Sequence, residues 1–201
     1  MSARDLSILA ERLIKEFPQY YGYFSEKSYT YNNIRQSNRN PLLYKSVGAD
    51  GLKTGHTSEA GYGLVASTLR KDRRLVLVVG GLTSVNERAR ETERLLDWGY
   101  REFGNFQLFS ASDVISEADV WLGTSSGVPL VIRDDLTITI SRKARRALNV
   151  SVVYDGPLAA PIDKGAQVAE LHITAPEMTD LKIPLFAGAD VSKLGMFGRL
   201  R

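Results

Sequence analysis

The sequence predicts an α+β fold in its first half and a small all-β fold in its second half. Two amphipathic helices are predicted, at residues 3–16 and from Ser84 onward. Between them lie two apolar runs rich in β-forming residues, 62–69 and 74–82. An antiparallel sheet with a helix at each end suits α+β packing, because the helices cover sheet faces that a hairpin cannot bury alone.

The first helix has clear start and stop signals. Ser2 is an N-cap residue, and Pro18 is expected to end the helix. Apolar residues recur between them at spacings of three and four: Leu6, Leu9, Ala10, Leu13, Ile14 and Phe17. The following segment, dense in Tyr and Asn, is predicted to be a loop with one short strand at 28–31.

The central part of the chain predicts a β-hairpin followed by the second helix. The charged residues 70–73 separate the two apolar runs and form the tip of the hairpin. A third strand is expected around the segment "DGLKTGHT" at 50–57. From Ser84 the period becomes helical, with apolar residues on one side and charges on the other.

After Gly104, which is expected to end the second helix, the character of the chain changes. Short β-branched runs follow one another: "DVWLG", "VPLVIR", "LTITIS", "NVSVVY" and "QVAELHI". Regular strands of this kind predict a small sandwich or barrel. We therefore predict a first domain at 1–104, a β-rich domain at 105–190 and a tail at 191–201.

Composition narrows the possible functions. Of 201 residues, 43% are hydrophobic and 24% charged, as in a soluble globular protein, and the net charge of +3 does not indicate a nucleic-acid binder. The absence of cysteine excludes disulfides, Cys-ligated metals and thiol nucleophiles, and two histidines are too few for a histidine-rich metal site. We expect no metal and no cofactor. Charged residues interrupt the N-terminus, so it lacks the apolar segment of a signal peptide. No apolar run reaches about 18 residues, the length needed to span a membrane.

The segment "DGLKTGHT" combines features that suit peptide binding. Because side chains alternate along a strand, Lys53 and Gly55 share one face. Glycine leaves room for a ligand along the strand, and an edge strand accepts an extended peptide through main-chain hydrogen bonds. With the Lys53 cation and the Thr54 hydroxyl nearby, the segment predicts recognition of a short peptide with a terminal carboxylate.

Three segments, "IRQSNRNPLLY", "DGLKTGHTSEAGYGLVAS" and "LVLVVGGLTSVNERARETERLLDWGYREF", resemble the serine D-alanyl-D-alanine carboxypeptidases, the low-molecular-mass penicillin-binding proteins. The resemblance covers residues 2–103, and the later strands are similar to the β-rich C-terminal domain of that family. It implies a partial penicillin-binding, transpeptidase-like domain, with antiparallel sheet and flanking helices, followed by a small β-sandwich.

The resemblance also implies roles for individual residues. Family members use Ser-x-x-Lys, Ser-x-Asn and Lys-Thr-Gly signatures, and Lys53, Thr54 and Gly55 match the third. Lys53 and Thr54 would bind the substrate and its carboxylate, and the backbone N–H of His56 would join the oxyanion hole. Arg88 matches an arginine that approaches the same carboxylate in some relatives.

The other two signatures are missing. No Ser-x-x-Lys occurs in the sequence, and the only Ser-x-Asn, at Ser84, follows Lys-Thr-Gly instead of preceding it, so Ser84 is interpreted as a helix N-cap. The nucleophile is therefore absent. We expect a chain that begins partway through the catalytic domain and is inactive alone, because the covalent mechanism needs both serine and base.

The resemblance implies a parent enzyme that trims the terminal D-alanine of peptidoglycan stem peptides through an acyl-enzyme and is acylated by β-lactams. Its expected location is periplasmic, on the outer face of the cytoplasmic membrane, with a C-terminal anchor of which this chain holds at most the start. A non-catalytic module that binds wall peptides or a protein is the alternative; a serine β-lactamase fits less well because of the β-rich domain.

Three further features have simpler interpretations. The side chain of His56 is expected to be a strand-end residue and not a general base, and His172 a surface strand residue. The basic cluster of Arg142, Lys143, Arg145 and Arg146 is interpreted as a solvated turn, although an anionic wall polymer or nucleic acid is the alternative partner.

Overall fold

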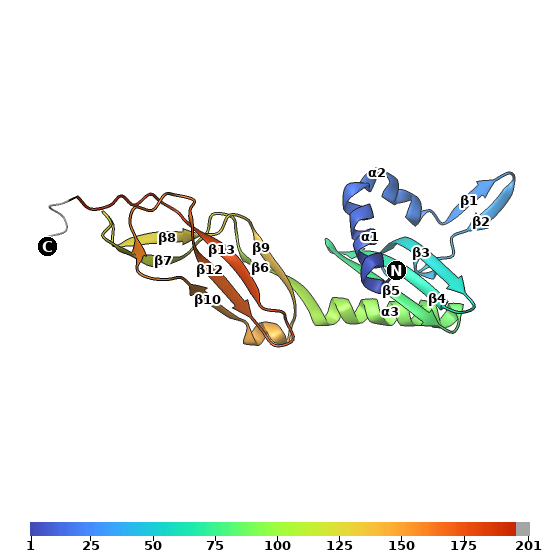
Figure 1. The fold of residues 1–201 in the computed structure, drawn as a ribbon. Helices are drawn as coiled ribbons and strands as arrows, with labels where there is room; N and C mark the ends of the chain where they lie inside the picture. The colour runs from blue at the N-terminus through green and yellow to red at the C-terminus, as the bar shows by residue number, and fades with distance from the viewer. Residues whose placement is uncertain (196–201) are drawn as a thin grey trace. The chain divides into compact units, whose positions relative to one another are not determined.

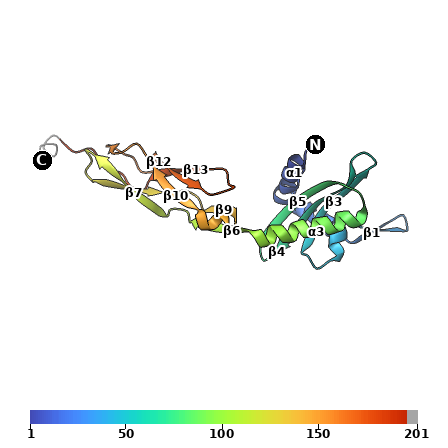
Figure 2. The same cartoon turned by 90° about the horizontal axis from the view of Figure 1, so that it is seen from below.

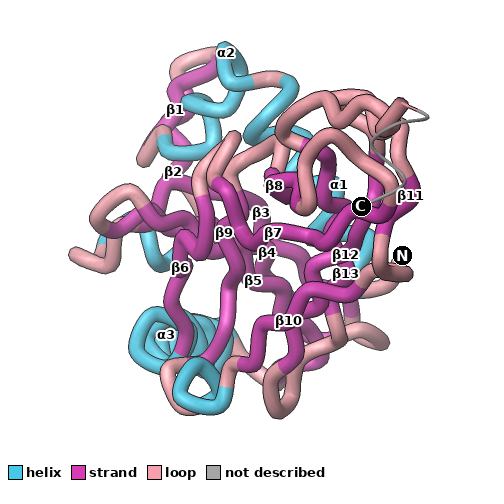
Figure 3. Tube along the Cα trace, turned by 90° about the vertical axis from the view of Figure 1, so that its left-hand side faces the viewer, coloured by secondary structure: helices cyan, strands magenta, loops and turns pink. Residues whose placement is uncertain are grey.

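The structure is a computed structural model that describes residues 1–195. The chain forms two compact units, Met1–Arg101 and Glu102–Arg201 (Figure 1). Strands, magenta in Figure 3, make up most of the regular structure of the second unit, and the α-helices belong to the first. The predicted division at 104/105 lies three residues beyond this boundary.

Helix α1 (Ala3–Glu16) has the predicted bounds and the predicted cap. The Asp5 N–H donates to Ser2 Oγ at 3.2 Å, and the Ser2 N–H donates to Asp5 Oδ2 at 2.8 Å, which completes a capping box. As predicted, this helix ends before Pro18, but Pro18 does not stop helical structure altogether. It begins a second short helix, α2 (Pro18–Tyr21), because proline is well tolerated in a first helical turn.

The tyrosine-rich segment contains a hairpin where one strand was predicted. After a 3₁₀ turn, η1 (Gly22–Ser25), the predicted strand β1 (Ser28–Tyr31) pairs with β2 (Ile34–Ser37). The two residues between them, Asn32 and Asn33, have φ of 47° and 62°, as a two-residue hairpin turn requires. The polar sequence "IRQS" of β2 gave no strand signal. A further 3₁₀ turn, η2 (Pro41–Tyr44), precedes the main sheet.

The main sheet of the first unit has three antiparallel strands in the order β3-β4-β5. They are β3 (Ala49–Thr57), β4 (Gly61–Arg70) and β5 (Arg73–Leu82), so the predicted hairpin and third strand are confirmed. Within the described residues β3 pairs only with β4 and is an edge of this sheet.

The two long helices cover opposite faces of this sheet (Figures 1 and 2). Leu64 of β4 and Val79 of β5 pair in register and join Leu96 of helix α3 (Val85–Glu102) in one cluster. Their neighbours Val65 and Val78 therefore point to the other face, where they line a cavity beneath α1. Each residue of β3 thus faces either α1 or α3.

The second unit is built from strands, which confirms the predicted all-β domain. One sheet has the order β10-β12-β13-β8-β7-β11, and a second consists of β6 and β9. The strands are β6 (Phe103–Phe109), β7 (Val114–Trp121), β8 (Gly127–Val131), β9 (Leu136–Ser141), β10 (Asn149–Val153), β11 (Leu158–Ala159), β12 (Gln167–Thr174) and β13 (Leu181–Ala187), with a 3₁₀ turn η3 (Ala144–Ala147) before β10. Gly104 lies inside β6 and not at the helix end, which is Glu102.

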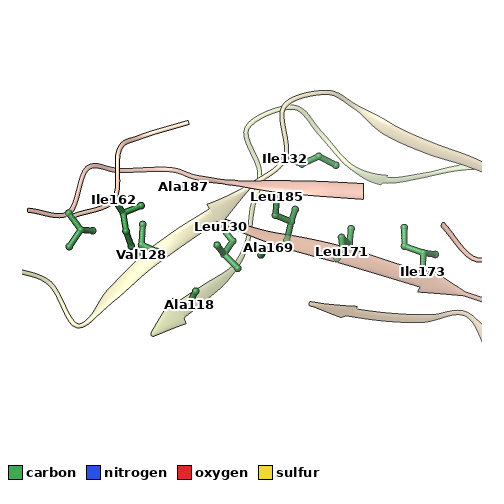
Figure 4. Close-up of a cluster of buried hydrophobic side chains, with 11 residues drawn as sticks. Ala118, Val128, Leu130, Ile132, Ile162, Ala169, Leu171, Ile173, Leu185 and Ala187 are labelled. Carbon is green, nitrogen blue, oxygen red and sulfur yellow. The ribbon is translucent and has the colours of Figure 1, made fainter. Parts of the chain in front are cut away.

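The core of this unit comes from alternate residues of its strands. Leu130, Leu171, Ile173 and Leu185 are completely buried in it (Figure 4). The described part of the predicted tail, 191–195, is joined to the unit by isolated bridges such as Ile162 with Val191. The rest of that tail, 196–201, where an anchor helix was predicted to start, lies outside the described residues. Of the described helices, none combines the length and the apolar character needed to cross a bilayer.

Candidate functional site

The edge strand β3 places the Lys-Thr-Gly residues at an open margin of the sheet. Lys53 pairs with Val65 and so faces α1, whereas Thr54 pairs with Leu64 and faces α3. A side chain built onto Gly55 would meet no atom within 4 Å. The face of the strand that carries Lys53 is therefore open at Gly55, so a ligand that lies along this edge strand would meet no side chain there.

The Lys53 ammonium group lies close to the backbone of its own strand. It donates a hydrogen bond of 2.6 Å to the carbonyl of Thr54. Beside it, between α1 and the sheet, is an apolar cavity of about 380 Å³, which Leu9 and Leu13 of α1 line together with Val65. Lys53 is thus a cation between an apolar hollow and the strand edge.

Arg88 of α3 is a buried cation that has no anionic partner within residues 1–195. Only 4% of its surface is exposed, and burial lowers the pKa of its guanidinium group. Its Nη2 donates to the Arg39 carbonyl at a long 3.4 Å, and its Nε has no hydrogen-bond partner. Among the described residues it forms no ion pair. A buried charge is costly unless it is paired, so this position favours an incoming anion.

Tyr62 links Arg88 to the β3 strand. Its ring lies 4.0 Å from the ring of His56, its cross-strand partner, and the Arg88 guanidinium group lies 5.7 Å from the Tyr62 ring centre. Aromatic and cation–π contacts of this kind contribute modestly to stability, but they fix the relative orientation of the side chains. The structure therefore brings Thr54, His56 and Arg88 to the same side of the sheet.

Sequence reasoning missed Tyr62 and the burial of Arg88, although signals for both exist. A hairpin centred on residue 59 puts 62 opposite 56. Arg88 lies four residues before Thr92 and eight before Leu96, so it continues the stripe of α3 that is buried. Arg88 itself was predicted as a carboxylate-binding residue from the family resemblance, but its burial was not predicted, because arginine is rarely buried without a partner.

Ser84 is a helix N-cap, as predicted. The N–H of Glu87 donates to its Oγ at 3.1 Å, and the N–H of Arg88 donates to its carbonyl at 3.0 Å. The hydroxyl is thus engaged in holding the start of α3.

The remaining candidates belong to the second unit. The His172 ring is hydrogen-bonded to Glu170 at 2.9 Å on strand β12, and this bond lowers the pKa of Glu170. In the basic cluster, the Arg145 guanidinium group stacks 4.0 Å from the Phe106 ring centre, which partly accounts for its presence at a turn.

Comparisons with known proteins indicate the family of the chain. Residues 1–83 match the family described as D-alanyl-D-alanine carboxypeptidase, and residues 103–193 match the family described as penicillin-binding protein 5, C-terminal domain. The D-alanyl-D-alanine carboxypeptidase DacA of Haemophilus influenzae is 37% identical over 99% of this chain and 51% of its own length. DacC of Escherichia coli is 37% identical over 99% of this chain and 50% of its own length.

A solved structure shows the same fold. Penicillin-binding protein 5 from Haemophilus influenzae superposes with a TM-score of 0.78 and 36% identity, covering 96% of this chain and 57% of that protein. The chain spans about half the length of the curated relatives it matches. The chain therefore belongs to the D-alanyl-D-alanine carboxypeptidase family through residues 1–83, and its residues 103–193 belong to the family of penicillin-binding protein 5 C-terminal domains.

Proposed function

We propose that this chain forms the substrate-recognition part of a serine D-alanyl-D-alanine carboxypeptidase, which removes the terminal D-alanine from peptidoglycan stem peptides through an acyl-enzyme. The observation that carries the proposal is the buried, unpaired Arg88 beside an edge strand that is open at Gly55. Together they offer a peptide both main-chain pairing and a cation for its terminal carboxylate.

Each predicted site residue has a role in this proposal. The peptide extends along β3 past Gly55, and Thr54 and Arg88 hydrogen-bond its carboxylate. Lys53 orients the substrate from the other side of the strand. The backbone N–H of His56 stabilises the negative charge that develops on the acyl oxygen, as oxyanion-hole donors do.

The covalent step requires groups that the 201 residues do not contain. The serine that attacks the acyl carbon and the lysine that takes its proton form a Ser-x-x-Lys signature, and no such sequence occurs here. The chain by itself is therefore proposed to recognise peptides without hydrolysing them. A whole protein that contains the signature would also be acylated by β-lactams. Its proposed location is the outer face of the cytoplasmic membrane.

Calorimetric titration with N-acetyl-D-alanyl-D-alanine tests the carboxylate contact. Arg88→Gln should weaken binding roughly tenfold or more, because hydrogen bonds to charged groups contribute about 1.5–3 kcal/mol. Arg90→Gln is the matched control, since Arg90 lies on the same helix with its side chain 72% exposed. The same peptide with an amidated C-terminus should bind as weakly to the unaltered chain as the acid binds to Arg88→Gln.

Two results would contradict the proposal. One is equal affinity of the unaltered chain for the acid and the amide. The other is an Arg88→Gln variant that folds and keeps full affinity for the acid.

A non-catalytic module that binds wall peptides is the second candidate. The observation in its favour is the same absence of Ser-x-x-Lys from the sequence. The test adds, as a separate polypeptide, the segment of a relative that contains the missing signatures. A non-catalytic module should bind the peptide as the enzyme fragment would, but the mixture should not hydrolyse it. Recovery of D-alanine release in that mixture would favour the enzyme.

A further inference from the structure

The β1–β2 hairpin and the turn before it border another hollow of the first unit, which is open to solvent and has a volume of about 430 Å³. The hairpin projects away from the β3–β5 sheet (Figure 1). Three tyrosines line the hollow, Tyr23 from η1 and Tyr29 and Tyr31 from β1. The carboxypeptidase site described above uses none of them.

The aromatic rings in this hollow are unusually accessible. Tyr23 is 73% exposed, and Tyr29 and Tyr31 are each 69% exposed. Because Tyr29 and Tyr31 are two residues apart in one strand, they project from the same face of the hairpin. An exposed cluster of large aromatic side chains is typical of an interaction site.

A network of hydrogen bonds holds the base of the hairpin in place. The Asn38 amide group donates to the carbonyls of Phe24 and Glu26 at 3.3 and 2.9 Å. The Tyr44 hydroxyl lies 2.7 Å from the Lys27 carbonyl and 3.1 Å from the Asn38 carbonyl. The hollow is therefore formed before any ligand arrives, which reduces the entropy cost of binding.

The rest of the lining is polar. It includes Glu26, Gln36 and Ser37, whose side chains make no hydrogen bond within the described part of the chain, and Gln36 pairs with Tyr29 and so shares its face of the hairpin. No aliphatic side chain lines the hollow; the exposed Ile34, in register with Tyr31, lies outside the lining. This composition does not suit an apolar protein anchor or an acyl chain.

We propose that the hollow binds a glycan, namely the sugar strand to which the stem peptide is attached. Tyrosine ring faces pack against the C–H face of a pyranose ring, and amide, hydroxyl and carboxylate groups bond its hydroxyls. The identity of this glycan rests on the proposed function, because a stem peptide hangs from a polysaccharide. The hairpin would then hold the polymer while β3 holds the peptide.

The test uses the chain and the β-1,4-linked tetramer of N-acetylglucosamine, with no peptide present, in an NMR titration. Tyr29→Ala and Tyr31→Ala should each weaken binding roughly fivefold, the size expected for loss of one aromatic contact. Tyr23→Ala, in a different element, should do the same. Ile34→Ala and Thr30→Ala are matched controls on the same hairpin and should leave the affinity unchanged.

Several outcomes would overturn this assignment: no binding of the tetramer at millimolar concentration, loss of binding in Ile34→Ala equal to that in the tyrosine variants, or hairpin-dependent binding to phosphatidylglycerol vesicles in place of the sugar. Arg88→Gln separates the two proposals. It should weaken peptide binding roughly tenfold or more and leave glycan affinity unchanged, so either proposal can fail while the other stands.

Discussion

At the scale of single residues, a polar network ties the segment after α1 to the sheet. The Tyr21 hydroxyl donates to Asp50 at 2.7 Å, and Arg74 donates to the same Asp50 oxygen at 2.8 Å. Arg74 also donates to the completely buried Ser67. Burial, with a contribution from the Asp50 carboxylate, raises the pKa of Tyr21 to about 12.

This raised pKa makes stability depend on alkaline pH. Since the folded pKa lies above the unfolded value of 10.0, the unfolded chain loses the Tyr21 proton first. The contribution is fully present below pH 10 and is lost as pH rises towards about 12. Between pH 8 and pH 11, urea unfolding should show a smaller loss of unfolding free energy in Tyr21→Phe than in the unaltered chain. Tyr20 is an exposed neighbour, so the control Tyr20→Phe should lose as much unfolding free energy as the unaltered chain. An equal loss in all three proteins would exclude Tyr21 as the cause.

At the scale of elements, two glycines near the ends of β3 have different tasks. Gly48 has a φ of 75°, and a side chain there would lie 2.6 Å from the Leu69 carbonyl oxygen. Gly55 has open space around it. The backbone conformation at position 48 requires glycine. At position 55 we attribute the glycine to the space that the ligand needs.

Alanine at each glycine separates folding from binding. Gly48→Ala should cost about 2 kcal/mol in the free energy of unfolding, because the left-handed conformation and the close contact both oppose a side chain. Gly55→Ala should change stability by less than about 0.5 kcal/mol but weaken N-acetyl-D-alanyl-D-alanine binding. Chemical denaturation and calorimetry measure the two effects. Full peptide affinity in Gly55→Ala would show that the peptide does not pass this residue.

The elements that sequence predicted correctly are those with local signals. The capped helix α1 and the alternating strands β4 and β5 carry their caps and periods in neighbouring residues. Strand β2 was missed because its residues are polar and its pairing comes from the Asn32-Asn33 turn. The helical spacing of Arg88 with Thr92 and Leu96 indicates that it shares their buried stripe, but its contact with Tyr62 depends on how α3 packs against the sheet, and that is a tertiary property.

At the scale of the whole molecule, each unit has a core of its own. Leu64 and Leu96 belong to the buried cluster of the first unit, and Leu130 and Leu171 to that of the second. The candidate peptide site and the tyrosine hollow both belong to the first unit. The structure thus concentrates the proposed recognition surfaces in one half of the chain.

Recognition without acylation is tested most directly by the intact mass of the purified chain after incubation with excess benzylpenicillin, with the drug shown to acylate a known penicillin-binding protein in parallel. We predict an unchanged mass, because the 201 residues contain no Ser-x-x-Lys and Ser84 is engaged as a helix cap. An increase equal to one drug molecule would contradict this prediction and would require a nucleophilic serine within the chain.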